Sequence, residues 1–279
     1  MQDVSLVAEI GINHNGDMDV VEHLIKEAAV AGFDYVKFQK RNLMETVPPN
    51  KRRQPKETPW GVVSYMEYKQ HLENIDYDFI ENYCNAYNIG WFGSPWDVDS
   101  VEYLASYNPE YIKVASAMVT DIPVLKAIRR SHIPVIISTG MSTEAQFENA
   151  LKVLDREQVR YILACTSTYP TEPYEMNMSF MRTLANQYPW AKIGFSNHSP
   201  GILFAAASVL YGAEMVEVHV TLDRAMFGSD QAASIEPQGM RKLRQYIENL
   251  RLGHGDGNWV VYPSEEKVAK SLRWKEYES

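Results

Sequence analysis

Two histidines stand at matching places in the last two apolar runs of this 279-residue chain. His198 follows the run A-K-I-G-F-S-N, and His219 ends M-V-E-V-H beside Glu217. Two imidazoles with open coordination positions suit a catalytic divalent ion, with Mn²⁺ as the first expectation and Co²⁺, Mg²⁺ or Zn²⁺ as alternatives. A single histidine is more often structural, but a pair beside a carboxylate predicts a metal site.

Two lysines interrupt other apolar runs at positions that a buried core would reject. Lys37 lies in Y-V-K-F-Q and Lys113 in Y-I-K-V-A-S. A buried ammonium group needs a carboxylate or an anionic ligand, so the pair predicts an anion site, with a structural ion pair of Lys37 and Glu9 as the alternative. Hydroxyl groups at further run ends would donate hydrogen bonds to the anion: those of Ser94, Ser116, Ser138, Thr139 and Ser196. The set predicts recognition of a phosphate or a phosphorylated carboxylate.

Eight short apolar runs carry these residues, and helix-like stretches separate them. The runs end on polar residues: Glu9, Gln39, Ser94, Ser116, Thr139, Thr166, Ser196 and His219. Continuous apolar runs are typical of strands buried on both faces, and their alternation with helices predicts a parallel sheet. Eight such units predict a closed (β/α)8 TIM barrel, an α/β fold whose strand carboxyl ends open onto one face. The polar residues would then converge on a single mouth.

Composition limits the class of protein. The length suits one barrel, expected over residues 1–257, and residues 258–279 are expected to form a tail or linker without a second domain. A formal charge of −9 argues against nucleic-acid binding, and no apolar stretch is long enough to cross a bilayer. The chain begins with a strand-like run and no leader, so we expect a cytoplasmic protein. Cys84 and Cys165 are expected to be reduced thiols.

Capping residues and prolines predict the segments between the runs. Asp17 and Gly32 bracket one amphipathic helix, and Ser142 opens another. Gly212 closes an apolar helix. Four prolines within residues 41–61 predict an exposed loop without regular helix, for which an active-site lid is the alternative.

Seven short motifs follow one another along nearly the whole chain. They are A-E-I-G-I-N-H-N-G at residues 8–16, V-K-F-Q at 36–39, Y-I-K-V-A-S at 111–116, S-T-G-M at 138–141, Y-P-T at 169–171, G-F-S-N-H-S at 194–199 and E-V-H-V-T-L-D-R at 217–224. Together they resemble the N-acetylneuraminate (sialic acid) synthase family. The resemblance implies a TIM-barrel transferase of carbohydrate biosynthesis that condenses phosphoenolpyruvate with an N-acetylated hexosamine such as N-acetylmannosamine. The products would be a 2-keto-3-deoxy nonulosonic acid and phosphate.

The resemblance also implies roles for individual residues and a homodimer. His198 and His219 match metal ligands, and Glu9, Lys37 and Glu217 match groups near the reacting atoms. The matches to substrate contacts are Gln39, Ser94, Lys113, Ser116, Ser138, Ser167, Tyr169, Ser196 and Asp230. Ser167 stands where many members have asparagine. The sugar contacts among these are Gln39, Tyr169 and Asp230.

Two departures from the family pattern leave alternatives open. Met118 stands where an acidic residue is common, so one proton-transfer or water-orienting group would be absent. No segment matches the C-terminal antifreeze-like domain, whose arginine contacts the sugar in longer members. We therefore expect weak binding of the acceptor unless Arg224 or the basic residues 51–53 substitute for that arginine. The acceptor could also be a precursor of legionaminic or pseudaminic acid. Other hypotheses are a metal-dependent aldolase or hydrolase acting on a phosphorylated substrate, and a non-catalytic barrel subunit.

Overall fold

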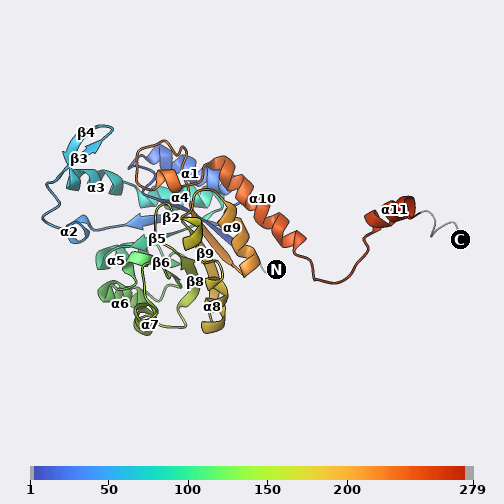
Figure 1. Ribbon diagram of the computed structural model, residues 1–279. Helices are drawn as coiled ribbons and strands as arrows, with labels where there is room; N and C mark the ends of the chain where they lie inside the picture. The colour runs from blue at the N-terminus through green and yellow to red at the C-terminus, as the bar shows by residue number, and fades with distance from the viewer. Residues whose placement is uncertain (1–2, 274–279) are drawn as a thin grey trace.

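The computed structural model describes residues 3–273 and contains a closed barrel of eight parallel strands (Figure 1). The strands are β1 (Ser5–Gly11), β2 (Tyr35–Lys40), β5 (Gly90–Pro95), β6 (Ile112–Val114), β7 (Val135–Ser138), β8 (Val159–Cys165), β9 (Lys192–Asn197) and β10 (Met215–His219). They pair in chain order, and β1 closes the ring between β2 and β10. The predicted (β/α)8 TIM barrel is therefore confirmed.

Helices connect successive strands and cover the outside of the barrel (Figure 1). They are α1 (Met18–Val30), α4 (Tyr77–Tyr87), α5 (Val98–Ala105), α6 (Ile122–Ser131), α7 (Glu144–Val153), α8 (Phe180–Gln187), α9 (Leu203–Ala207) and α10 (Pro237–Gly253), with short 3-10 helices η1 (Ser116–Met118), η2 (Pro173–Glu175), η3 (Ser208–Tyr211) and η4 (Gln231–Ala233). Asp17 caps α1 as expected, and Gly32 follows its end with a φ of 79°. Thr143, and not Ser142, caps α7. The helix predicted to end at Gly212 is divided into α9 and η3.

The apolar core has two parts, one on each side of the strands. Outward-facing strand residues such as Val36 and Ile137 pack beneath the helices in one continuous cluster. Inside the barrel lies a smaller plug of Val7, Phe92, Ile136, Tyr161, Leu163 and Met215. Polar or thiol side chains stand two positions after plug residues: Glu9, Ser94, Ser138, Cys165 and Glu217. Because side chains two positions apart share a strand face, these side chains point into the barrel above the plug.

The strand register places the polar strand ends side by side. Glu9 pairs with Lys37 of β2 on one side and with His219 of β10 on the other. Ser196 of β9 pairs with Glu217 of β10. Neighbouring strands lie roughly 4.8 Å apart, so side chains paired in this way come within contact distance on the inner face.

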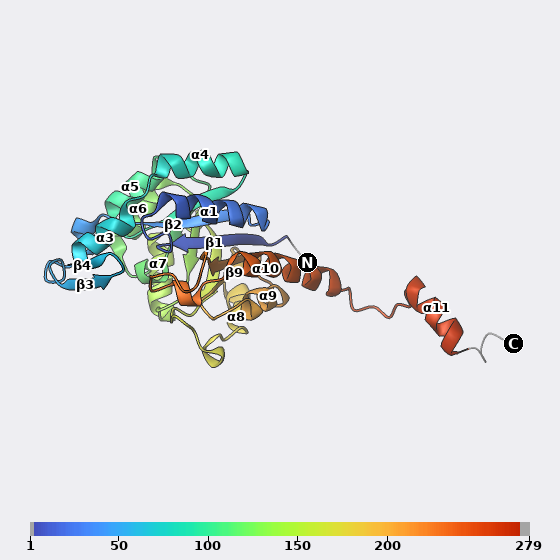
Figure 2. The same ribbon diagram turned by 90° about the horizontal axis from the view of Figure 1, so that it is seen from above.

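The chain between β2 and α4 is more regular than its prolines predicted. It forms one helical turn, an antiparallel hairpin and a helix: α2 (Leu43–Thr46), β3 (Pro55–Thr58), β4 (Gly61–Ser64) and α3 (Tyr65–Glu73). α2 ends before Pro48, and Pro55 starts an edge strand, where a missing N–H group is tolerated. Figure 2 shows the hairpin at the end of the barrel toward which β1 points. The expectation of an irregular loop is therefore corrected.

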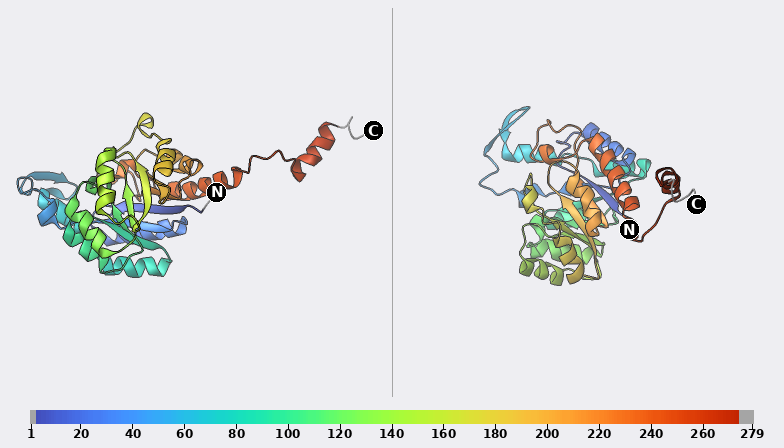
Figure 3. Two further views of the ribbon diagram at one scale, coloured as in Figure 1. Left: turned by 90° about the horizontal axis from the view of Figure 1, so that it is seen from below. Right: turned by 45° about the vertical axis from the view of Figure 1, so that its right-hand side comes forward.

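The chain leaves the barrel after α10, at the end opposite the hairpin (Figure 2). Beyond this point α11 (Pro263–Leu272) stands clear of the barrel (Figure 3), and Trp259 in the connecting segment is 100% exposed. The domain boundary at residue 257 stays a prediction, and residues 274–279 of the expected tail lie outside the described part of the chain. None of the helices within residues 3–273 is both long and apolar enough to cross a membrane.

Candidate functional site

All predicted site residues but two, Thr139 and Asp230, line one cavity at the carboxyl-end mouth of the barrel. They are Glu9, Lys37, Gln39, Ser94, Lys113, Ser116, Ser138, Ser167, Tyr169, Ser196, His198, Glu217 and His219. Asp230 lies in the loop after β10, where its Oδ2 is 3.8 Å from Nδ1 of His219. Thr139 does not line the cavity, and its Oγ1 accepts from the main-chain N–H group of Cys165 at 3.2 Å, so the expectation that it contacts the anion is corrected. The sequence prediction missed the other lining residues: Trp96, Ala115, Ala117, Met141 and Cys165.

Two buried lysines and two buried glutamates form the centre of the cavity. Lys37 Nζ lies 3.0 Å from Glu217 Oε2 and 3.4 Å from Glu9 Oε2. Lys113 Nζ lies 2.9 Å from Glu217 Oε2, and Ser196 Oγ donates to Glu217 Oε1 at 3.0 Å. The structural ion pair of Lys37 with Glu9 therefore exists, but within a larger cluster. Both ammonium groups therefore lie next to the same carboxylate oxygen, Oε2 of Glu217.

Burial and neighbouring charges shift the pKa values of this cluster in different directions. Burial alone would raise the pKa of Glu217, but Lys113 and Lys37 hold it well below its usual range. Burial raises the pKa of Glu9, and Lys37 opposes this only in part. Burial lowers the pKa of Lys113, whereas for Lys37 the two carboxylates outweigh burial and raise the pKa. Glu217 is therefore ionised at neutral pH, and Glu9 is the carboxyl group better able to hold a proton.

Buried polar atoms without hydrogen-bond partners concentrate in the cavity. Within the part of the chain that the structure describes, eight buried side-chain atoms lack a hydrogen-bond partner. Five of these belong to cavity residues: Glu9 Oε2, Ser94 Oγ, Trp96 Nε1, Ser138 Oγ and His219 Nδ1. Buried polar groups are nearly always paired in folded proteins, and an unpaired group costs about 1–3 kcal/mol. The hydroxyl groups of Ser94 and Ser138 are therefore available to a ligand.

The two imidazoles lie next to each other, with ring centroids 5.3 Å apart. His198 Nδ1 is 2.7 Å from the carbonyl oxygen of Thr166, which can only accept, so Nδ1 carries a proton and Nε2 is left for other partners. The hydroxyl of Tyr169 lies 2.9 Å from that Nε2. Burial lowers the pKa of His219 to about 3, so its ring is neutral at physiological pH.

Burial would lower the pKa of His198, but its hydrogen bond to Cys165 raises it. Two adjacent imidazoles at this separation fit the predicted metal site, because a divalent ion binds imidazole nitrogen at roughly 2.0–2.1 Å. Residues 3–273 contain no group of three or more histidine, cysteine, aspartate or glutamate side chains arranged to hold a metal.

A close-packed cluster around Gly140 forms another wall of the cavity. Cys165 Sγ lies 3.6 Å from Ser116 Oγ and 3.4 Å from Ser167 Oγ. A Cβ atom on Gly140 would lie 2.2 Å from Ser167 Oγ and 2.7 Å from Ser116 Oγ. Burial would raise the pKa of the Cys165 thiol, but its hydrogen bond to His198 lowers it to about 7. The only signal for Cys165 in the sequence is the alternation of side chains along β8, which places it on the same inner face as Tyr161 and Leu163.

Strand β6 is shorter than the sequence indicated and explains the position of Met118. The strand ends at Val114, and Ser116 begins the 3-10 helix η1. This turn places Ala117 on the cavity wall, whereas Met118 packs against the outer core. The position that is commonly acidic in the family pattern therefore contributes to packing in this chain.

Two of the possible substitutes for the sugar-contacting arginine, Arg224 and Arg52, hydrogen-bond to main-chain atoms outside the cavity. Arg224 and Arg52 each donate from Nε to a main-chain carbonyl oxygen at 3.0 Å. Arg41, which was not predicted, donates instead to Oε1 of the cavity residue Gln39.

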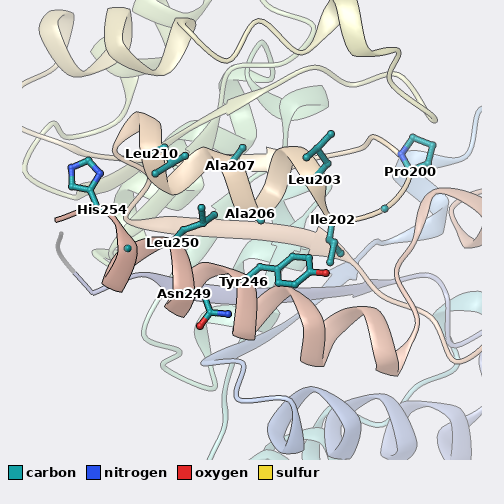
Figure 4. Close-up of a pocket in the computed structure, with 12 residues that line it drawn as sticks. Pro200, Ile202, Leu203, Ala206, Ala207, Leu210, Tyr246, Asn249, Leu250 and His254 are labelled. Atoms are coloured by element: carbon teal, nitrogen blue, oxygen red, sulfur yellow. The ribbon is translucent and has the colours of Figure 1, made fainter. Parts of the chain in front are cut away.

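A larger apolar groove of about 760 Å³ lies on the outside of the barrel, between α9, η3 and α10 (Figure 4). Apolar side chains dominate its wall, among them Leu203, Leu210 and Leu250. No lysine, arginine, aspartate or glutamate lines it. The mouth cavity is smaller, at about 80 Å³, but it holds the charged and unpaired groups. We therefore place the candidate active site at the mouth.

Comparison with known proteins identifies the family. Residues 24–258 match the model of the NeuB family. The chain belongs to the NeuB family. It is 34% identical to N-acetylneuraminate-9-phosphate synthase of Drosophila melanogaster over 274 residues, which cover 96% of this chain and 72% of that protein. It is 33% identical to N,N'-diacetyllegionaminic acid synthase of Campylobacter jejuni over 285 residues, covering 98% of this chain and 85% of that protein.

A solved structure extends the NeuB-family likeness to three dimensions. The crystal structure of N-acetylneuraminic acid synthetase from Leptospira borgpetersenii, in complex with citrate, matches with a TM-score of 0.82 at 30% identity. The match covers 98% of this chain and 93% of that one. The family resemblance indicated by the seven sequence motifs is therefore confirmed.

Proposed function

We propose that this NeuB-family protein condenses phosphoenolpyruvate with an N-acetylated hexosamine, such as N-acetylmannosamine, to a 2-keto-3-deoxy nonulosonic acid and phosphate. The observation that carries the proposal is the combination of two buried lysines with unpaired serine hydroxyls in one cavity. The matched relatives in Drosophila melanogaster and Campylobacter jejuni, synthases of N-acetylneuraminate-9-phosphate and of N,N'-diacetyllegionaminic acid, support this substrate class.

The cavity offers charge and hydrogen bonds to the phosphoryl and carboxylate groups of phosphoenolpyruvate. Lys37 and Lys113 both contact Glu217, and Lys37 also contacts Glu9. An ammonium group has three N–H donors, so each lysine keeps a donor for a bound anion. The free hydroxyls of Ser94 and Ser138 supply neutral donors. Charge-assisted hydrogen bonds of this kind contribute about 1.5–3 kcal/mol each.

A divalent ion, with Mn²⁺ as the first choice, is part of the proposal. His198 and His219 would hold it. When bound, such an ion acts as a Lewis acid that polarises the carbonyl group of an open-chain aldose. The hydroxyl of Tyr169, at 2.9 Å from His198 Nε2, is placed to orient the acceptor beside the imidazoles.

Glu9 is the residue proposed to handle a proton near the reacting atoms. In the reaction, the C2=C3 double bond of phosphoenolpyruvate opens as C3 bonds to the aldehyde carbon, whose oxygen takes up a proton. Water adds at C2, and the bond from C2 to the phosphate oxygen breaks as the C2 ketone forms. Of the two protons of the added water, one balances the proton on the aldehyde oxygen and the other leaves with phosphate. The raised pKa of Glu9, caused by burial, suits a carboxyl group that gives or accepts the proton on the aldehyde oxygen. Gln39 Nε2 donates to Glu9 Oε1 at 2.9 Å and fixes the orientation of the carboxyl group.

Phosphate release from phosphoenolpyruvate, measured with Mn²⁺ and a panel of N-acetylated hexosamines, tests the proposal. We expect release only when both substrates are present. Release without an aldose would favour the hydrolase hypothesis. Metal and phosphoenolpyruvate binding without release for any sugar would favour a non-catalytic subunit.

A further inference from the structure

Trp96 lines the cavity directly after β5, yet the prediction from the sequence missed it. Its indole Nε1 atom is buried and has no hydrogen-bond partner. The indole N–H can only donate, and it cannot turn toward water without moving the whole ring. We infer that Trp96 determines specificity for the acceptor sugar by donating this N–H to a sugar oxygen. The inference rests on the proposed function and deepens it.

Arg41 holds the indole ring in place. Its guanidinium carbon lies 4.1 Å from the centroid of a Trp96 ring, the geometry of a cation–π contact. Glu73 fixes the arginine, with its Oε1 3.4 Å from Nη1 and its Oε2 accepting from the Arg41 main-chain N–H at 3.1 Å. The Arg41 side chain is only 11% exposed. Arg41 is therefore a positioning residue, because it orders Trp96 and does not itself line the cavity.

The same guanidinium group orders a second donor. Arg41 Nη2 donates to Gln39 Oε1, and Gln39 Nε2 donates to Glu9 Oε1 at 2.9 Å. The amide oxygen of Gln39 is therefore occupied, which leaves its remaining N–H group for a ligand. One arginine thus presents two neutral donors, from Gln39 and Trp96, to the same cavity.

The depth of these donors favours the sugar over the anion as their ligand. Lys37 and Lys113, the groups that an anion would seek, are 4% and 2% exposed. Trp96 and Gln39 are half-buried, and they stand two positions beyond Ser94 and Lys37 toward the carboxyl-end mouth. Both donors are neutral, which suits the hydroxyl and acetamido oxygens of a hexosamine. A site built to pair such oxygens discriminates strongly against analogues that lack them.

Steady-state kinetics with Trp96→Phe test the inference, because phenylalanine keeps an aromatic ring against Arg41 but removes the N–H group. We expect the acceptor KM to rise about 2- to 12-fold, the factor for one neutral hydrogen bond, with the KM for phosphoenolpyruvate unchanged. Arg41→Lys keeps the charge but loses the planar fork, so the acceptor KM should rise here too. The double variant should show less than the product of the two effects.

Trp190→Phe is the matched control, because Trp190 also stacks with an arginine, Arg156, at 4.7 Å but does not line the cavity. Its acceptor KM should equal that of the wild type. An unchanged acceptor KM in Trp96→Phe, with normal wild-type turnover, would overturn the inference.

Indole ¹⁵N–¹H spectra give a measurement independent of turnover. The chain has six tryptophans, and the signal absent from Trp96→Phe identifies Trp96. We expect N-acetylmannosamine, used as the probe, to shift this signal and phosphoenolpyruvate to leave it in place. If the chemical shift of the Trp96 signal does not change when the sugar is added, or changes only with phosphoenolpyruvate, the inference is overturned. A sugar-dependent shift in a protein that releases no phosphate with any sugar would support it while refuting the proposed function.

Discussion

Replacing Lys113 with methionine removes one of the two ammonium groups at the centre of the mouth and keeps a side chain of similar length. Lys113 Nζ lies 2.9 and 3.2 Å from the two carboxylate oxygens of Glu217, and the residue is 2% exposed. The loss of one charge-assisted hydrogen bond costs about 1.5–3 kcal/mol. The dissociation constant of phosphoenolpyruvate should therefore rise about 12- to 140-fold.

The fold should tolerate Lys113→Met because Glu217 keeps other partners. Lys37 Nζ remains 3.0 Å from Glu217 Oε2, and Ser196 Oγ donates to Oε1 at 3.0 Å. The loss of stability should therefore be smaller than the ~3–5 kcal/mol expected when a buried charge is left without a partner. Urea denaturation of the variant measures this difference.

Titration calorimetry with phosphoenolpyruvate and, separately, with the acceptor sugar decides the role of Lys113. We expect the sugar affinity to change much less than the phosphoenolpyruvate affinity. Lys40→Met is the control, since Lys40 also ends a strand but pairs with Glu73 at 3.5 Å and does not line the cavity. Equal losses for both ligands, or an unchanged phosphoenolpyruvate affinity, would show that Lys113 serves only as the structural partner of Glu217.

Three further predictions concern the metal, the pH dependence and the wall around Gly140. His198→Ala and His219→Ala should each lose bound Mn²⁺ in metal analysis with an unchanged circular dichroism spectrum, and full metal content in both would contradict their role as ligands. Burial lowers the pKa of His14 to about 4, so this ring gains a proton on unfolding; stability should fall as the pH drops from about 6.5 toward 4, by up to about 3 kcal/mol. Urea denaturation between pH 7 and 4.5 should show that the free energy of unfolding falls less with decreasing pH in His14→Asn than in the wild type. The same pH dependence in both proteins would refute this. Gly140→Ala should raise the KM for phosphoenolpyruvate, because the new methyl group forces the Ser116 and Ser167 hydroxyls to rotate away. Since these hydroxyls can rotate, Tm should change little. An unchanged KM would show that these serines do not contact the anion.

The sequence predicted the barrel well because its strands are buried on both faces. Their apolar runs contrast sharply with polar residues such as Lys37 and Lys113, which cannot remain in a core without partners. The closed parallel barrel then brings strand ends together whatever their separation in the chain. The positions of strand-end residues such as Lys37 and Lys113 therefore follow from the fold class, whereas Ser167, Tyr169 and Asp230 came from the family resemblance. The chemical roles of all of them stay predictions.

The residues that the sequence did not reveal depend on contacts between distant segments. Trp96 gains its place from Arg41, 55 positions away, and this stacking leaves no periodic signal in the sequence. Cys165 ends an apolar strand and resembles a core residue until the inner face of β8 is known. The hairpin of β3 and β4 was missed because Pro55 and Gly61 suggest a loop when their edge positions are unknown.

The formation of a carbon–carbon bond between phosphoenolpyruvate and the aldose is the central claim, and isotope labelling tests it most directly. Phosphoenolpyruvate labelled with ¹³C at C3 and N-acetylmannosamine labelled with ¹³C at C1 are incubated with the protein and Mn²⁺, and the products are examined by NMR. We predict a one-bond coupling between the two labelled carbons, appearing in step with released phosphate. Phosphate release with labelled pyruvate as the product and no such coupling would contradict the proposed function.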